Sequence, residues 1–156
     1  MASFIVHPIA REIAEQARTT RRSPQYGHPA HEELALGTGP CRECLRAFTV
    51  GAERRLLFTY GPLTGTLALP QPGPIFIHAE ACTPHRGVGY PDGLREIAVV
   101  AQAYYDDGTI ADSQMLPTGG EAAQLATLLE EPRVQFVHLR HAEAGCFIGR
   151  VERVAL

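Results

Sequence analysis

Proline and glycine divide this chain into short segments, and this restricts the folds open to it. The sequence has 12 Pro and 15 Gly among 156 residues, and many of them fall in residues 19–40, 61–74 and 82–93. No apolar period persists through residues 19–40, and so long a loop in a small protein is usually functional or disordered. We therefore expect short strands and helices joined by long Pro/Gly-rich loops.

Apolar spacing between these loops predicts the regular elements. A helix is expected after Pro8, with Ile9, Ile13 and Ala17 on one face, and a second helix after residues 118–121, where Thr118 and Glu121 have capping-box spacing. Short apolar runs predict strands at residues 4–6, 56–60, 75–77, 97–105, 109–116, 134–139 and 147–154. Asp107-Gly108 favours a tight hairpin turn. The order predicts an α+β fold, mostly an antiparallel sheet with two main helices, in a single domain over residues 1–156.

Charge and composition narrow the expected partners and the compartment. The 14 basic and 17 acidic residues give a net charge of −3, which argues against broad nucleic-acid binding. Arginine pairs such as Arg21-Arg22, with Arg18 nearby, and Arg54-Arg55 are read as solvated surface. No apolar run approaches the ~20 residues of a membrane helix, and the first residues do not resemble a secretion signal. We expect a cytoplasmic protein that does not bind membranes, whose thiols stay reduced.

Missing residue types exclude several mechanisms. Every basic residue is Arg, and the chain has no Lys and no Asn. Schiff-base chemistry, a P-loop lysine and a Cys-His-Asn triad are therefore excluded. Any enzyme hypothesis is limited to thiol, imidazole, carboxylate or metal chemistry.

The spacing of cysteine and histidine predicts one candidate metal site. Cys41 and Cys44 form a C-x-x-C pair, and His78 and Cys82 follow at the end of a predicted strand. The full pattern is C-x2-C-x33-H-x3-C, and three Cys with one His are an accepted tetrahedral zinc set. A site filled by four protein ligands is structural, whereas catalytic zinc needs an open position.

Two other interpretations of these residues remain open. Cys44 and Cys82 can be small buried hydrophobic residues, with His78 a hydrogen-bonded residue at a strand end. A thioredoxin-like pair needs its first thiol at a helix N-terminus, and the Thr49-Val50-Gly51 stretch leaves little room for that helix.

The remaining cysteine and histidines give weaker candidates. Cys146 or Cys82 is a candidate nucleophile, with His78 or His138 as its base. His28 and His31 lie three apart in the first long loop. Two polar side chains exposed to solvent explain them more simply than a shared pair of ligands does. His138 and His141 are three apart at a strand end, so shared ligation requires His141 to have left the strand.

Four short motifs are distributed over most of the chain. They are residues 39–46 (GPCRECLR), 73–78 (GPIFIH) with Cys82, 105–110 (YDDGTI) and 144–147 (AGCF). In these motifs and in their order, the chain resembles a bacterial family, the domain of unknown function 1203. The resemblance implies a small, single-domain bacterial protein inside the cell and assigns no catalytic residue. It also implies that some members lack the second Cys of the pair, and that many carry Asn at the position of His141.

We therefore predict a small bacterial accessory or binding domain stabilised by zinc at Cys41, Cys44, His78 and Cys82. The alternative is an enzyme that uses a Cys/His site, thiol-based or metal-assisted. The sequence names no substrate and no partner.

Overall fold

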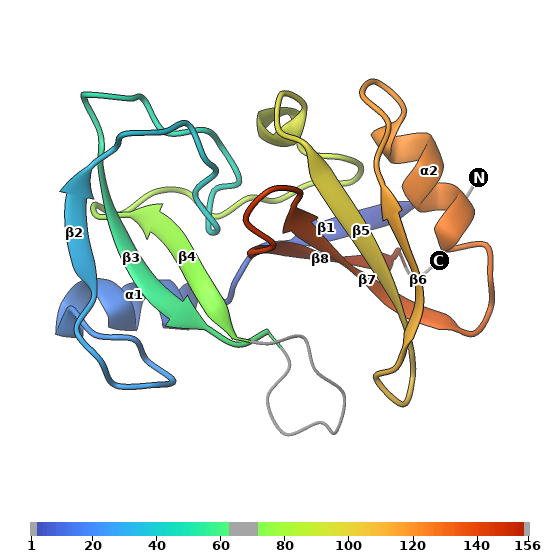
Figure 1. Cartoon of the computed structure of the whole chain (residues 1–156), viewed down its shortest axis with the longest axis horizontal. Coiled ribbons are helices and arrows are strands. Elements are labelled where there is room, and N and C mark those ends of the chain that lie inside the picture. Colours follow the sequence, from blue (N-terminus) through green and yellow to red (C-terminus); the bar gives the residue numbers. More distant parts are fainter. Residues whose placement is uncertain (1–2, 63–71, 155–156) are drawn as a thin grey trace.

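The computed structural model describes residues 3–62 and 72–154. Within these residues, eight strands, two α-helices and a short 3-10 helix, η1 (Asp92–Leu94), form an α+β fold with two antiparallel sheets. Figure 1 shows the sheets side by side, with α1 (Arg11–Thr20) along the smaller sheet and α2 (Glu121–Leu128) against the larger. The predicted fold class is confirmed, although the strands divide into two sheets.

The larger sheet has five strands in the order β1-β8-β7-β5-β6. The strands are β1 (Phe4–His7), β5 (Val99–Tyr105), β6 (Ile110–Met115), β7 (Val134–His141) and β8 (Phe147–Arg153). The predicted hairpin turn joins β5 to β6, and Gly108 there has a φ of +84°, which only glycine adopts readily. The strands of this sheet are four to eight residues long, and β5 ends where the sequence pattern predicts a turn.

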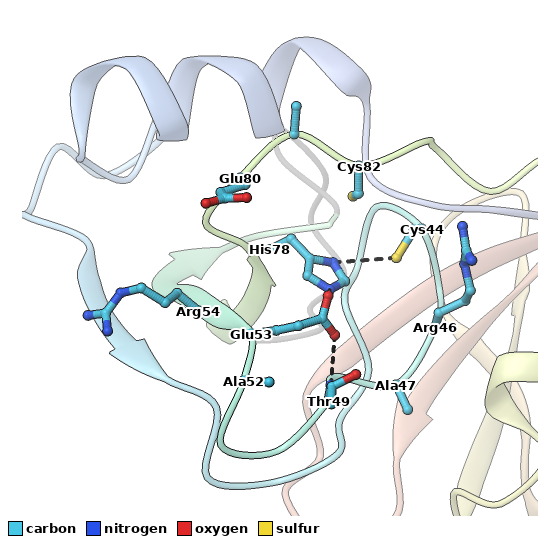
Figure 2. Close-up of a pocket in the computed structure, with 11 residues that line it drawn as sticks. Cys44, Arg46, Ala47, Thr49, Ala52, Glu53, Arg54, His78, Glu80 and Cys82 are labelled. Carbon is cyan, nitrogen blue, oxygen red and sulfur yellow. Dashed lines mark hydrogen bonds and ion pairs between the residues drawn. The ribbon is translucent and has the colours of Figure 1, made fainter.

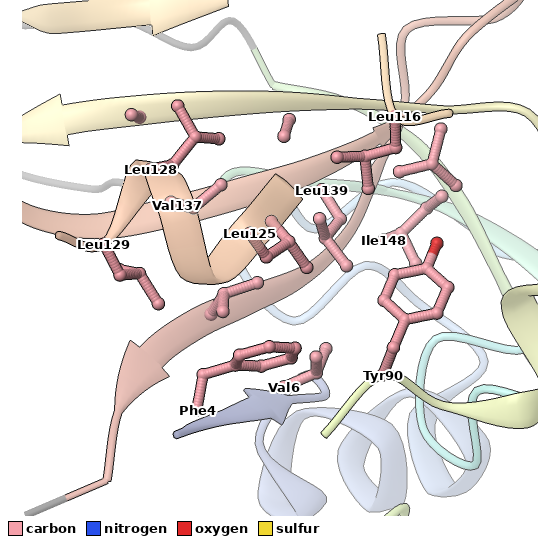
Figure 3. Close-up of a cluster of buried hydrophobic side chains, with 14 of the residues drawn as sticks. Phe4, Val6, Tyr90, Leu116, Leu125, Leu128, Leu129, Val137, Leu139 and Ile148 are labelled. Atoms are coloured by element: carbon pink, nitrogen blue, oxygen red, sulfur yellow. The ribbon is translucent and has the colours of Figure 1, made fainter. Parts of the chain in front are cut away.

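One face of this sheet packs against α2 and forms a hydrophobic core (Figure 3). Leu125 and Leu128 of α2 lie over Val137 and Leu139, which are alternate residues of β7. Alternation places the residues between them, including His138, on the opposite face. The sheet therefore has one face covered by α2 and a second face of different composition.

The smaller sheet has the order β2-β3-β4 and carries the candidate site. Its strands are β2 (His31–Leu34), β3 (Arg54–Tyr60) and β4 (Gly73–His78). Alternate apolar residues of β3 and β4 pack with Ala14 and Ala17 of α1 in a second core that also contains Cys41, Cys44 and Phe48. Phe147 of β8 joins the same core, so the two sheets meet there.

The sequence pattern missed β2, which lies within the predicted loop of residues 19–40. Its sequence, HEEL, has no apolar alternation, and most of its residues are exposed. The strand forms through pairing with β3, where His31 lies opposite Leu57 and Leu34 opposite Arg54. The predicted loop over residues 61–74 falls largely outside the described residues, although Gly73 and Pro74 belong to β4.

Both helices begin later than the sequence predicts. Residues 8 and 9 precede α1, because the Ile9 N–H donates to the Arg42 carbonyl at 3.1 Å instead of entering the helix. The capping-box prediction is wrong: Gly120 is the N-cap of α2, and no side chain caps it. A turn closed by the Gly120 N–H on the Pro117 carbonyl, at 2.9 Å, places Thr118 before the helix.

A membrane-spanning segment is not found among the helices of the described residues, none of which combines the necessary length with sufficient apolar character.

Candidate metal centre

Cys41 and Cys44 lie in a tight turn that directs both sulfurs to one side. The Leu45 N–H donates to the Cys41 carbonyl at 2.9 Å, and the Cys41 N–H donates to the Arg46 carbonyl at 3.0 Å. Leu45 closes the turn with a φ of +56°, a left-handed conformation that costs a non-glycine residue about 1–2 kcal/mol. Its fully buried side chain offsets that strain. The turn is therefore held by its own hydrogen bonds and by the core.

Gly93 of η1 packs directly against this turn. A Cβ atom at Gly93 would lie 2.3 Å from the Leu45 carbonyl oxygen, which is far inside van der Waals contact. Only glycine allows the backbone of η1 to approach the Cys41–Cys44 turn so closely. The conformation of the turn therefore depends on a residue about fifty positions away in the sequence.

The structure brings the four predicted ligands together in one cluster. His78 ends β4, Cys82 follows in the next loop, and the four donor atoms all lie within 4.8 Å of one another. The Cys41 and Cys82 sulfurs are 3.8 Å apart, and the Cys44 sulfur lies 3.5 Å from Nδ1 of His78. All the cysteines are free thiols. This Cys3His cluster could hold a metal ion.

The distances between the donor atoms fit a metal ion with four tetrahedral ligands. Metal–ligand distances of about 2.3 Å for sulfur and 2.0–2.1 Å for imidazole nitrogen give tetrahedral edges of about 3.8 Å for a sulfur pair and about 3.6 Å for sulfur and nitrogen. The two contacts above match these edges within about 0.1 Å. The other pairs of donor atoms are at most 4.8 Å apart, so a small inward movement of the ligands completes the tetrahedron.

Glu53 orients the His78 ring from the side away from the sulfurs (Figure 2). Its Oε2 lies 2.8 Å from Nε2 of His78, and its Oε1 accepts the Thr49 N–H at 2.7 Å. The Phe48 ring packs against the imidazole at 4.6 Å between centroids, and the His78 side chain is only 12% exposed. A carboxylate behind a histidine ligand is a recurrent feature of metal sites, since it fixes the ring and the nitrogen that faces the ion.

Sequence reasoning missed Glu53. It precedes β3, and the pairing of Arg55 with His78 in the β3–β4 register brings it beside the imidazole. A charged residue after a glycine turn gives no local signal of this role.

Hydrogen bonds among the sulfurs and the imidazole shift their pKa values strongly. The pKa of Cys41 is held far below that of an ordinary thiol, first by a hydrogen bond from the Cys44 thiol and then by bonds from Cys82 and His78. The same contacts with Cys41 and Cys44 raise the pKa of His78 to about 10 and raise the pKa of the Cys82 thiol. Negative charge therefore collects at Cys41 inside the cluster, where a bound cation would neutralise it.

Arg18 and Glu43 form a nearly buried ion pair beside Cys82. Arg18 Nη2 lies 2.7 Å from Glu43 Oε1, with side chains 12% and 1% exposed, and Arg18 Nε donates to the His78 carbonyl at 3.0 Å. Arg18 Nη2 also approaches the Cys82 sulfur at 3.6 Å. The interpretation of Arg18 as solvated surface is therefore wrong, because this side chain connects α1 to the cluster. The same interpretation is wrong for Arg55 of the Arg54-Arg55 pair. This side chain is also buried, with its guanidinium 3.8 Å from the Phe76 ring centroid.

Two hollows lie on either side of Cys82. The larger, about 570 Å³, is lined by Cys44, Glu53, His78 and Cys82 among other residues (Figure 2). The smaller, about 290 Å³, lies between α1 and the loop after β4, and Arg18, Glu43 and Cys82 border it. Of the four cysteines, all of which the structure describes, Cys82 alone borders both hollows.

Cys146 and His138, the other candidates for a catalytic thiol and base, lie outside the Cys3His cluster. Cys146 precedes β8, where its thiol contacts the Ala144 carbonyl at 3.7 Å. His138 is fully buried among the rings of Tyr104, Phe136 and Phe147, each 5.0 Å away, and burial lowers its pKa to about 3. Neither ring nitrogen of His138 has a hydrogen-bond partner in the described part of the chain. No contact joins it to a thiol among the described residues.

The other histidines make local structural contacts. Nε2 of His28 accepts the Thr59 N–H at 3.2 Å, which ties the first long loop to β3. Nδ1 of His141 accepts the N–H groups of Glu143 and Ala144, at the end of β7. His31 is exposed on β2. None of them belongs to the Cys3His cluster.

Fold and cluster together define a small α+β protein with two antiparallel sheets and a Cys3His cluster at the edge of the smaller one. The chain belongs to the family described as "Protein of unknown function (DUF1203)", whose model matches residues 38–153 and so spans all four cluster residues. The resemblance seen in the sequence motifs is confirmed. No curated protein and no solved structure matches the chain.

Proposed function

We propose that this chain is an accessory or binding domain of the cytoplasm whose smaller sheet is stabilised by a structural zinc ion. Cys41, Cys44, His78 and Cys82 would be the four ligands. The observation that carries the proposal is the convergence of four soft donor atoms within 4.8 Å, with two contacts at tetrahedral edge lengths.

The surroundings of the cluster support a zinc ion over buried thiols alone. Glu53 supplies the carboxylate that commonly stands behind a histidine ligand, and it contacts the nitrogen that faces away from the sulfurs. Thiolate and imidazole donors select zinc over magnesium or calcium, which prefer oxygen. Four protein ligands fill a tetrahedron, and this supports a structural role for the ion.

A structural ion here would join segments that lie far apart in the sequence. The ligands come from the Cys41–Cys44 turn, the end of β4 and the following loop, and Arg18 connects α1 to the same point. Because a structural zinc site contributes directly to folding free energy, we expect the smaller sheet to depend on the metal more than the larger one does.

A thiol enzyme is the second candidate, and one observation favours it. Cys44, His78 and Glu53 lie in the order of a thiol, an imidazole and an orienting carboxylate, with contacts of 3.5 Å and 2.8 Å. They border the larger hollow. Such a triad would not require Cys41 or Cys82, whereas a metal site uses both.

Metal analysis of untagged protein tests the proposal. Purified protein should contain about one equivalent of zinc by mass spectrometry, and Cys41→Ser should reduce this to below about a tenth. Cys146→Ser is the matched control, since its thiol lies outside the cluster, and it should keep its zinc. Wild-type protein without zinc, with Cys41 and Cys44 freely alkylated, would contradict the proposal. Zinc-free protein whose Cys44 stays reactive in Cys41→Ser would instead support the thiol enzyme.

A further inference from the structure

The three cysteines of the cluster differ in their access to solvent. Cys41 is fully buried and Cys44 is 4% exposed, whereas Cys82 is half-buried and lies in the loop after β4. Cys82 also borders both hollows, while Cys41 borders neither. A small molecule that enters either hollow therefore reaches the Cys82 sulfur before that of Cys41.

The cysteines also differ in the hydrogen bonds that reach sulfur. Cys41 accepts the His78 backbone N–H at 3.3 Å and a backbone N–H from Cys44. Within the described residues, the N–H group that reaches the Cys82 sulfur belongs to the Arg18 guanidinium, at 3.6 Å, and Glu43 and the His78 carbonyl share that guanidinium. N–H groups withdraw charge from a thiolate, so the Cys82 sulfur, whose guanidinium contact is long and shared, keeps a more nucleophilic electron pair than the Cys41 sulfur does. Burial, rather than hydrogen bonding, distinguishes Cys44 from Cys82.

A carboxylate adds to this difference. Oε1 of Glu43 lies 3.3 Å from the Cys82 sulfur, close enough to accept a proton from the thiol. When zinc replaces that proton, the same carboxylate faces a thiolate and repels its charge. A zinc ion bound by three thiolates and one imidazole also carries a net negative charge, which further favours reaction at sulfur.

We propose that Cys82 is a reactive zinc-bound thiolate, open through the two hollows to small, soft carbon electrophiles. This inference rests on the proposed zinc site and adds a modification chemistry to it. The Cys82 sulfur attacks the electrophilic carbon, a carbon–sulfur bond forms, and the bond to the leaving group breaks with its electron pair. The products are a Cys82 thioether and the leaving anion, and Cys41, Cys44 and His78 would still hold the zinc ion.

Alkylation of the zinc-loaded protein tests this proposal. Cys146→Ser protein, with its zinc content measured first, is treated with limiting iodoacetamide, and the modified peptides are followed by mass spectrometry. Cys82 should be modified about tenfold faster than Cys41 or Cys44, at a rate proportional to iodoacetamide. Cys82→His, which keeps a fourth ligand but no thiol there, should lose the fast phase and retain zinc.

Two results would overturn the inference. One is modification of all three ligand cysteines together, at a rate independent of iodoacetamide, because reaction would then wait for zinc to dissociate. The other is zinc-loaded protein in which Cys82 is as protected as Cys41. Both leave the zinc site itself intact as a proposal. Protein that carries no zinc at the outset contradicts the zinc site, and with it this inference, and the zinc measurement made before alkylation distinguishes the two cases.

Discussion

Replacement of His138 by Leu should remove much of the acid sensitivity of this protein. His138 is fully buried on the face of the larger sheet opposite α2, and both its ring nitrogens lack partners among the described residues. An unpartnered buried polar group costs about 1–3 kcal/mol, so a Leu of similar volume should leave stability at pH 7 unchanged or raise it by about 1 kcal/mol.

The effect of pH follows from the environment of the imidazole. Burial, with smaller contributions from the positive charges of Arg140 and Arg150, lowers the pKa of His138 to about 3 in the folded protein, against an unfolded value of 6.5. Since the unfolded chain takes up this proton first, neutral His138 contributes its full stability above about pH 6.5. That contribution decreases by about 1.4 kcal/mol per unit as the pH falls from about 6.5 to about 3.

Urea unfolding at pH 7 and pH 5, followed by circular dichroism, measures this contribution. Wild-type protein should lose about 2 kcal/mol more of its unfolding free energy between these pH values than His138→Leu does. Because the unfolding free energies of the two proteins are compared at the same pH values, the contributions of other titrating groups, including the Cys3His cluster, cancel. His31→Gln, at an exposed histidine, should behave as wild type. Equal losses in wild type and His138→Leu would refute the reasoning, because His138 would then not be held neutral by burial.

The two remaining predictions concern the support of the cluster. Glu53→Gln should weaken zinc binding about 10- to 100-fold, because the group that orients His78 loses its charge. Competition with a chelator measures this affinity, and an unchanged value would show that Glu53 does not support the site. Gly93→Ala should lower the unfolding free energy by about 1–3 kcal/mol, because the new Cβ meets the Leu45 carbonyl. Gly73→Ala, where no atom of the described residues lies within 4 Å of a new Cβ, should be nearly neutral, and equal effects of the two substitutions would contradict this account.

Local patterns in the sequence predict much of this fold. The hairpin turn at Asp107-Gly108 and the apolar runs in β3, β4, β5 and β7 are properties of a few neighbouring residues, and they correctly predict most strands. The same patterns miss β2, because its four residues are mostly exposed and the strand depends on pairing with β3. The start of α1 is misplaced for a similar reason, since Ile9 bonds to the Arg42 carbonyl.

In the candidate site, too, local spacing predicts some features and long-range packing determines the others. Cys41 and Cys44 are found by spacing because one tight turn places both sulfurs, and His78 and Cys82 are found because they follow one strand. That the two pairs meet at all depends on the packing of the turn against β4, including the Arg42 N–H bond to the Phe76 carbonyl.

The residues that would set the chemistry of the cluster also come from distant parts of the sequence. Glu53 reaches His78 through the register of β3 with β4, and Arg18 reaches Cys82 because α1 docks on the smaller sheet. In the sequence they are ordinary charged residues, one after a glycine turn and one on a polar helix. Spacing therefore identifies which atoms can bind a metal, whereas the packed structure determines how each is oriented and which sulfur is left accessible.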